Sequence, residues 1–124
     1  MIQKESNLIV SDNSGGRILK CISMKNSYKS VSSAFIIKGA IQRLRNKRRS
    51  KSRVKVGKLY SVLILQVNRK LVRKSGKTFK FSKNCCIVIG KHNEPMATRV
   101  FDGVPKEARR KRKSKLFLMA PYVY

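Results

Sequence analysis

The chain of 124 residues carries 31 lysines and arginines against 5 aspartates and glutamates, which gives a formal net charge of +26. A hydrophobic fraction of 41% is enough for one domain of ordinary size and excludes a wholly disordered chain. Repulsion among so many cations opposes compaction, so the composition predicts a polyanionic partner. No apolar run approaches the roughly 20 residues of a membrane span. Met1–Val10 resembles neither a secretory signal nor a transit peptide, so we expect the protein to stay in the compartment where it is made.

Short apolar runs rich in β-branched residues predict five strands separated by turn sequences. They cover Asn7–Val10, Arg17–Met24, Ala34–Ile41, Lys58–Val67 and Asn84–Ile89, with shorter extended pieces at Leu71–Val72 and Thr78–Phe81. Ser75–Gly76 is typical of a hairpin tip. Strands at this spacing indicate a small barrel or sandwich, and a closed barrel would leave no free edge. Phe35, Phe79, Phe81 and Phe101 are expected in the core, whereas Tyr28, Tyr122 and Tyr124 are better candidates for stacking or an interface.

The glycine-containing turn Asp12–Gly16 lacks the Lys-Ser/Thr ending of a phosphate-binding P-loop. We interpret it as a turn that needs the positive φ of glycine, and expect Arg17 beside it to contact RNA.

Three basic clusters follow the strands and turns. The segment Gln42–Lys55 is interpreted as a long loop or flexible arm, because eight of its fourteen residues are cationic. A second cluster, around the predicted hairpin, contains Arg69, Lys70, Arg73, Lys74 and Lys77, and a third contains Arg109, Arg110, Lys111, Arg112 and Lys113. Within the first segment the cations are Arg43, Arg45, Lys47, Arg48, Arg49, Lys51, Arg53 and Lys55. Such runs neutralise phosphates and release counterions, which predicts nucleic-acid binding.

The last part of the chain changes character at Pro105, which can open a short helix over Lys106–Arg110. A second helix is predicted over Lys115–Met119 and is ended by Pro121. We therefore expect one domain, with a β-barrel over about residues 1–101 and a short-helix segment over 102–124. The apolar run Leu116–Met119 completes the core or contacts a partner protein, and the sequence leaves both alternatives open.

Catalysis, metals and cofactors are not expected. His92 is the single histidine, and it has no evident nucleophile or base beside it. Cys21, Cys85 and Cys86 lack the spacing of metal ligands and are interpreted as buried or half-buried free thiols in a reducing compartment. Glu94 and Glu107 are expected to pair with nearby arginines. A β-core with basic loops suits irregular RNA better than DNA grooves, although a histone-like architectural protein stays an alternative.

Motifs along the whole chain resemble universal large-subunit ribosomal protein fourteen of the bacterial and organellar type. That family begins M-I-Q, continues V-A-D-N-S-G-A and then has C-I; this chain has Met1-Ile2-Gln3, Val10–Gly15 and Cys21-Ile22. The later matches are Lys55–Gly57 to K-K-G, Phe81 with Asn84-Cys85 to F-D-x-N-A, Pro95–Phe101 to P-x-G-T-R-I-F, Lys106–Arg109 to R-E-L-R, and Leu118–Tyr124 to S-L-A-P-E-V-L. The departures are Ala97 for a glycine, Ser82 for an acid, Leu65–Val67 for V-R-T, Asp102–Val104 for G-P-V, and a longer, more basic Gln42–Lys55. Such drift suits an organelle ribosome better than a bacterial one. We expect a mitochondrial ribosome, with a plastid or the bacterial cytoplasm as alternatives.

The resemblance implies a small closed five-stranded β-barrel followed by short helices. It also implies binding to large-subunit rRNA, a bridge to small-subunit rRNA, and contacts with ribosomal proteins three and nineteen, the latter by extending a sheet. A ribosome-silencing factor docks on the family's C-terminal region, and Thr98, Arg99 and Lys115 match positions on that surface.

Overall fold

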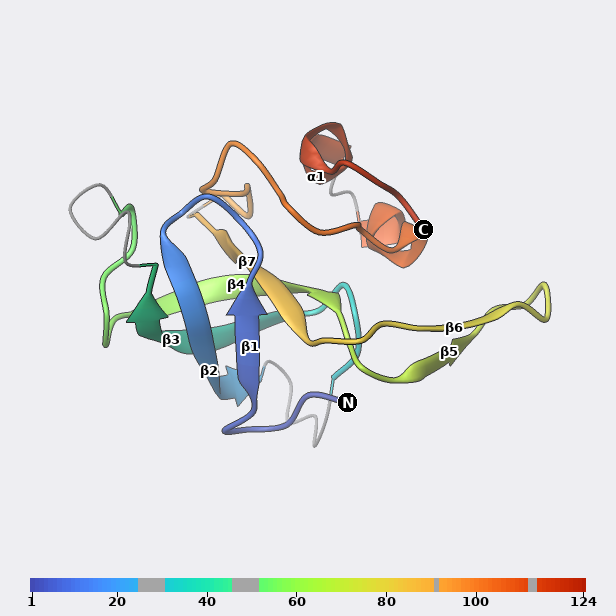
Figure 1. The fold of residues 1–124 in the computed structure, drawn as a ribbon, viewed down its shortest axis with the longest axis horizontal. Coiled ribbons are helices and arrows are strands. Elements are labelled where there is room, and N and C mark those ends of the chain that lie inside the picture. The colour runs from blue at the N-terminus through green and yellow to red at the C-terminus, as the bar shows by residue number, and fades with distance from the viewer. Residues whose placement is uncertain (25–30, 46–51, 91, 112–113) are drawn as a thin grey trace.

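The protein is mainly β, with a closed barrel of five strands and a separate two-stranded ribbon (Figure 1). The computed structural model describes residues 1–24, 31–45, 52–90, 92–111 and 114–124. Within these residues the strands are β1 (Asn7–Val10), β2 (Gly16–Met24), β3 (Ile36–Leu44), β4 (Leu59–Gln66), β5 (Lys70–Val72), β6 (Thr78–Lys80) and β7 (Cys85–Ile89). A 3-10 helix, η3 (Lys106–Lys111), and one short α-helix, α1 (Ser114–Met119), follow.

The barrel closes in the order β1-β2-β3-β4-β7. β1 lies between β2, which is antiparallel to it, and β7, which is parallel to it and places Val10 opposite Cys86. Because β7 also pairs with β4, no strand of the barrel is left with an unpaired edge. The closed five-stranded barrel expected from the sequence is confirmed.

The unbroken apolar run of β4 has a simple cause, since both faces of the strand are buried. Val62 and Ile64 point into the barrel core, whereas Leu63 and Leu65 belong to a second buried cluster outside the barrel. That second cluster contains Ile87 and Ile89 of β7 and Val100, Val104, Ala108 and Leu116 from the C-terminal segment. The C-terminal segment, coloured orange to red, therefore covers the outer wall made by β4 and β7 (Figure 1). A strand covered on both faces does not alternate apolar and polar residues.

Two strand boundaries differ from the prediction at β3. The strand begins at Ile36 rather than Ala34, because Ala34 has a φ of 66° and cannot lie in an extended strand. It ends at Leu44 rather than Ile41, since Arg43 pairs with Ile18 and Leu44 with Gly16. The start of the predicted flexible arm is therefore wrong, because Gln42–Leu44 extend the barrel.

The first C-terminal element confirms the short helix expected over Lys106–Arg110, and it is of the 3-10 type. η3 is a 3-10 helix, and the Ala108 N–H donates to the Pro105 carbonyl oxygen three residues earlier, at 3.0 Å. The second element, α1, confirms the predicted helix over Lys115–Met119 and starts one residue earlier.

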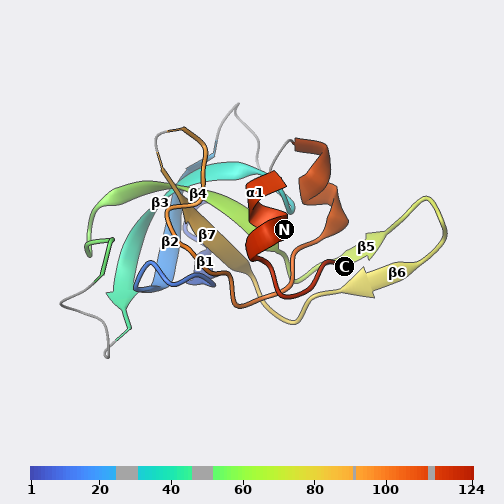
Figure 2. The ribbon, with the colours of Figure 1, turned by 90° about the horizontal axis from the view of Figure 1, so that it is seen from above.

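β5 and β6 form a hairpin that projects from the barrel (Figure 2). The Arg73 N–H donates to the Lys77 carbonyl oxygen at 3.0 Å, and Gly76 has a φ of 77° at the tip. The predicted hairpin tip at Ser75–Gly76 is confirmed.

Candidate nucleic-acid interface

The turn between β1 and β2 is built around a buried carboxylate. Asp12 is fully buried and accepts hydrogen bonds from the Ser14 N–H at 2.9 Å, from the Ser14 hydroxyl, and from the Val88 N–H at 2.8 Å. Gly15 has a φ of 103°, so the prediction of a turn that needs this conformation is confirmed there. The turn is fixed to β7 through Val88.

Asn13, at the tip of this turn, holds the segment that contains Thr98 and Arg99. Its side-chain amide donates to the Thr98 hydroxyl at 2.7 Å, and its side-chain oxygen accepts from the Thr98 N–H at 2.9 Å. Its backbone N–H donates to the Arg99 carbonyl oxygen at 3.3 Å. Both Thr98 and Arg99 are exposed, so this turn presents them to solvent.

The described ends of the basic segment are anchored to the same end of the barrel. The Arg45 guanidinium donates to the Val10 carbonyl oxygen at 3.0 Å and lies 4.9 Å from the centre of the Phe101 ring. Arg53 donates through its backbone to Ser14 at 2.9 Å and through its guanidinium to the Met96 carbonyl oxygen. Val54 is fully buried. These residues are therefore part of the folded body, which favours the predicted long loop over a flexible arm at the described ends of the segment.

We name this region the barrel-end surface, and define it by exposed or half-buried residues that the contacts above bring together. It consists of Arg17, Arg43, Arg45, Arg53, Thr98 and Arg99. Lys55 is also exposed, and its backbone N–H donates to the Tyr60 hydroxyl at 2.9 Å. Lys47, Arg48, Arg49 and Lys51 lie outside the described residues.

A second cationic region surrounds Arg73 on the hairpin. The Arg73 guanidinium pairs with Glu107 at 2.9 Å, donates to the Tyr124 carbonyl oxygen at 2.9 Å and lies 4.2 Å from the centre of the Phe79 ring. The predicted pairing of Glu107 with an arginine is confirmed. Arg73 therefore ties the hairpin to η3 and to the C-terminal residues.

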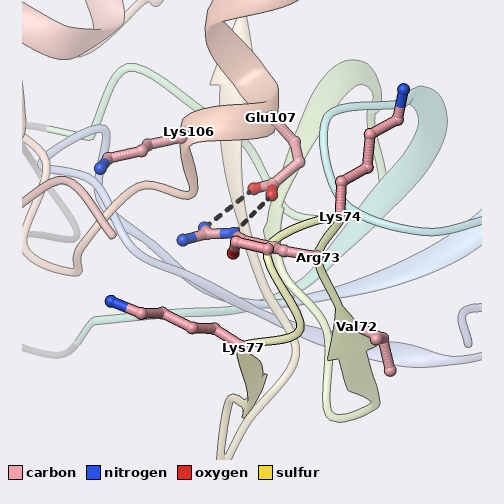
Figure 3. Close-up of a pocket in the computed structure, with 7 residues that line it drawn as sticks. Val72, Arg73, Lys74, Lys77, Lys106 and Glu107 are labelled. Carbon is pink, nitrogen blue, oxygen red and sulfur yellow. Dashed lines mark hydrogen bonds and ion pairs between the residues drawn. The ribbon is translucent and has the colours of Figure 1, made fainter.

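Other cations gather around this ion pair, in a cavity of about 600 Å³ (Figure 3). We name this region the hairpin surface and define it as Lys70, Arg73, Lys74, Lys77 and Lys106. Arg69 is exposed beside it. Arg109, Arg110 and Lys111 lie in η3, but their side chains, like Arg112 and Lys113 as a whole, fall outside the described residues.

The structure places the first two of the basic clusters predicted from the sequence far apart. The described ends of the Gln42–Lys55 segment lie at one end of the long axis, and the β5–β6 hairpin projects at the other (Figures 1 and 2). The barrel between them is rigid, because its strands pair all round. A bound polyanion could therefore be contacted at two places held at a fixed separation.

Lys115 approaches the barrel-end surface from α1. Its ammonium lies 2.8 Å from a Glu94 carboxylate oxygen, and this hydrogen bond and charge lower the pKa of Glu94. Glu94 was expected to pair with an arginine, and that expectation is wrong because α1 brings Lys115 to it. The Val100 N–H also donates to the Met119 carbonyl oxygen at 3.4 Å, so α1 lies against the strand-like segment after Arg99.

Sequence reasoning missed a groove on the hairpin side, of about 780 Å³. It is lined by aromatic rings and by lysines that were not singled out, Lys80 and Lys83. Phe101 lies in this groove and is 47% exposed, so its predicted place in the core is wrong. The alternation of basic and aromatic residues in Lys77–Lys83 is the pattern that pointed to it.

The three cysteines are free and buried, as predicted. Burial and the charge of Asp102 raise the pKa of Cys85 to about 12, and burial raises that of Cys86 well above its ordinary value. Both thiols are therefore protonated at neutral pH and are weak nucleophiles. Across the described part of the chain, no group of three His, Cys, Asp or Glu side chains could hold a metal ion. No described helix has the length and apolar character needed to cross a membrane.

Asp102 links the segment after Arg99 to Ser11, which directly follows β1, so protonation of its carboxylate should change the free energy of unfolding. Partial burial opposes its ionisation, but hydrogen bonds from Lys83 and Ser11 outweigh burial, so the pKa of Asp102 is lowered. A carboxylate with a lowered folded-state pKa stabilises the fold above its unfolded pKa and loses that contribution as pH falls.

We therefore expect Asp102→Asn to lower the free energy of unfolding at pH 7. We expect the difference from the parent chain to shrink as the pH falls below about 4, where the unfolded state begins to protonate the carboxylate, and to vanish once the pH is below the lowered pKa of Asp102 in the folded state. Urea titrations from pH 7 to pH 2 measure this. A difference that stayed constant down to pH 2 would show that the charge of Asp102 contributes nothing.

A comparison against protein-family models identifies the family to which the chain belongs. A model described as ribosomal protein L14p/L23e matches residues 1–124, which is the whole chain. The match extends through the barrel, the hairpin and the C-terminal segment that covers β4 and β7. The protein therefore belongs to the L14p/L23e family of large-subunit ribosomal proteins, whose members are structural constituents of the ribosome.

Proposed function

We propose that this protein binds large-subunit rRNA through the barrel-end surface and the hairpin surface. The observation that carries the proposal is the distribution of charge: +26 over the chain, with exposed cations at both ends of a rigid barrel. Among the described acids, Glu5, Glu94, Glu107 and Asp102 each have a cationic partner and Asp12 is buried, so the excess charge has no internal neutralisation. rRNA phosphates supply that neutralisation.

Family membership supports a finer placement at the face that meets the small subunit, with a bridge to small-subunit rRNA. The positions of three exposed residues, Thr98, Arg99 and Lys115, support this placement. Hydrogen bonds to Asn13 hold Thr98 and Arg99, and an ion pair with Glu94 holds Lys115. We also propose contacts with ribosomal proteins three and nineteen, and docking of a ribosome-silencing factor on Thr98, Arg99 and Lys115. The departures from the family motifs, such as Ala97 and Ser82, favour a mitochondrial ribosome.

The barrel-end surface can be tested by removing two exposed arginines that lie on adjacent strands. Arg17→Ala with Arg43→Ala should leave the barrel folded, because both side chains are exposed. If each arginine contacts a phosphate of double-helical rRNA, the slope of log affinity against log salt should become shallower by about 2. Filter binding to purified large-subunit rRNA at several salt concentrations measures the slope.

The control is Lys4→Ala with Lys38→Ala, which removes the same charge from exposed positions toward the opposite end of β2 and should change the slope less. Equal slopes in the two variants would contradict a specific role for the barrel-end surface. Sucrose-gradient fractionation with mass spectrometry tests the whole proposal. The chain should be recovered in the large-subunit peak, and recovery with DNA instead would overturn it.

A further inference from the structure

The groove beside the hairpin surface brings exposed and half-buried aromatic rings together with several cations. Its aromatic lining consists of Phe79, Phe81, Phe101, Tyr122 and Tyr124. Its cations are Arg73, Lys77, Lys80 and Lys83, against one acid, Asp102, which Lys83 already neutralises at 2.8 Å. A volume of about 780 Å³ lies within the usual range of ligand sites, roughly 300–1,000 Å³.

The rings form an ordered platform rather than a loose apolar patch. Phe79 and Phe81 meet edge to face with ring centres 5.3 Å apart, and Phe81 meets Tyr124 in the same way at 6.1 Å. Arg73 covers one face of Phe79 at 4.2 Å. These contacts fix the positions of the rings before any ligand arrives, which reduces the entropy lost on binding.

Tyr124 is held over the backbone of Gly103. A Cβ atom added to Gly103 would lie only 2.2 Å from the Tyr124 ring, so glycine is what allows the ring to rest there. The Tyr124 N–H also donates to the Val104 carbonyl oxygen at 2.9 Å. Even so, Tyr124 is 52% exposed and Tyr122 is 67% exposed. The Tyr124 ring is thus held in place with about half of its surface open to solvent, and the more exposed Tyr122 lines the same groove.

The cationic cavity of the hairpin surface adjoins this groove, because Arg73 and Lys77 line both. In Figure 3 the amines of Lys77 and Lys106 lie on the same side as the Arg73 guanidinium, whereas Lys74 points away. Because Glu107 neutralises Arg73, an anion in this cavity would be bound mainly by Lys77 and Lys106. Aromatic rings next to a site for an anion are the arrangement needed to bind a nucleotide, whose base stacks on a ring and whose phosphate pairs with the cations.

We propose that the groove binds one unpaired nucleotide of RNA, with the base against Tyr122 and Tyr124 and the phosphate beside Lys77 and Lys106. The proposal rests on the proposed rRNA-binding function and adds a class of ligand, single-stranded rather than double-helical RNA. A stacked base is recognised by its face, which is available only when the base is unpaired. The cationic lining disfavours a basic or purely apolar peptide.

The test uses the full chain and an oligouridine of about ten nucleotides that carries one photoreactive 5-iodouridine, beside an RNA duplex of equal length. Tyr122→Ala with Tyr124→Ala should weaken binding of the single strand roughly tenfold and should change binding of the duplex less than about twofold. Both side chains are largely exposed, so the variant should fold, and circular dichroism checks this.

Leu118→Ala is the matched control, because Leu118 is 89% exposed on α1 and does not line the groove. It should change neither affinity by more than about twofold. Photo-crosslinks in the parent chain should map by mass spectrometry to Tyr122 or Tyr124. Lys77→Ala should make the salt slope for the single strand shallower by about 0.7.

Crosslinks confined to other peptides, or an equal loss of affinity for both RNAs in the tyrosine variant, would overturn the nucleotide site and leave the proposed function standing. A parent chain that bound neither RNA would instead overturn rRNA binding itself. Capture of a ribosomal protein in this groove, with no crosslink to RNA, would assign the groove to a protein partner and refute the proposal.

Discussion

Leu116→Ala is expected to lower the free energy of unfolding by about 2–5 kcal/mol, the usual cost of emptying a buried leucine position. Leu116 is 1% exposed and packs in the outer cluster with Leu63, Leu65 and Ile87. Its loss leaves a cavity between α1 and the wall formed by β4 and β7. Because η3 and α1 carry Glu107 and Lys115, the variant should also loosen the ion pairs to Arg73 and Glu94.

The same helix provides the control. Leu118→Ala removes an identical side chain that is 89% exposed, and we expect a change within about 0.5 kcal/mol. Urea denaturation followed by circular dichroism measures both variants at one salt concentration. Similar losses in the two variants would show that α1 is not fastened to the barrel through Leu116.

Asp12→Ala is expected to cost about 3 kcal/mol, because it leaves the N–H groups of Ser14 and Val88 buried without their acceptor. The turn that Asp12 shapes positions Asn13, which in turn holds Thr98 and Arg99. We therefore expect a second effect, faster hydrogen exchange of the Thr98 amide. Chemical denaturation and amide exchange together test the two consequences.

Glu5→Ala is the control for charge, since it also removes one carboxylate from a strongly cationic chain. Glu5 is exposed and pairs with Lys20 at 3.1 Å on the surface, so its loss should cost less than about 1 kcal/mol. If both variants lost the same stability, net charge rather than the buried hydrogen bonds of Asp12 would be the cause.

Local pattern was a good guide where a segment's own residues decide its conformation. β1, β7 and the hairpin tip at Gly76 were predicted within a residue, because β-branched runs and a glycine with positive φ act over a few neighbours. The boundary of β3 could not be predicted, since Arg43 and Leu44 become a strand only through pairing with β2. A pattern of neighbouring residues does not predict this pairing, because the partner strand lies elsewhere in the sequence.

The sequence by itself determined the mainly β character, the cationic charge and the family resemblance, because apolar periodicity, charge and motifs are properties of composition and order. The strand pattern left a barrel and a sandwich open, and the resemblance pointed to the closed barrel. Tertiary structure alone decided which lysines and arginines have a hydrogen-bond or ion-pair partner within the protein. Arg45 and Arg53 bind backbone carbonyls, and Arg73 is neutralised by Glu107, although all three looked alike in the sequence. Closure of the barrel and the return of the C-terminal segment bring Phe79, Phe101 and Tyr124 to one groove. These residues are far apart in the sequence. They meet only because the C-terminal segment folds back and buries the apolar outer face of β4 and β7.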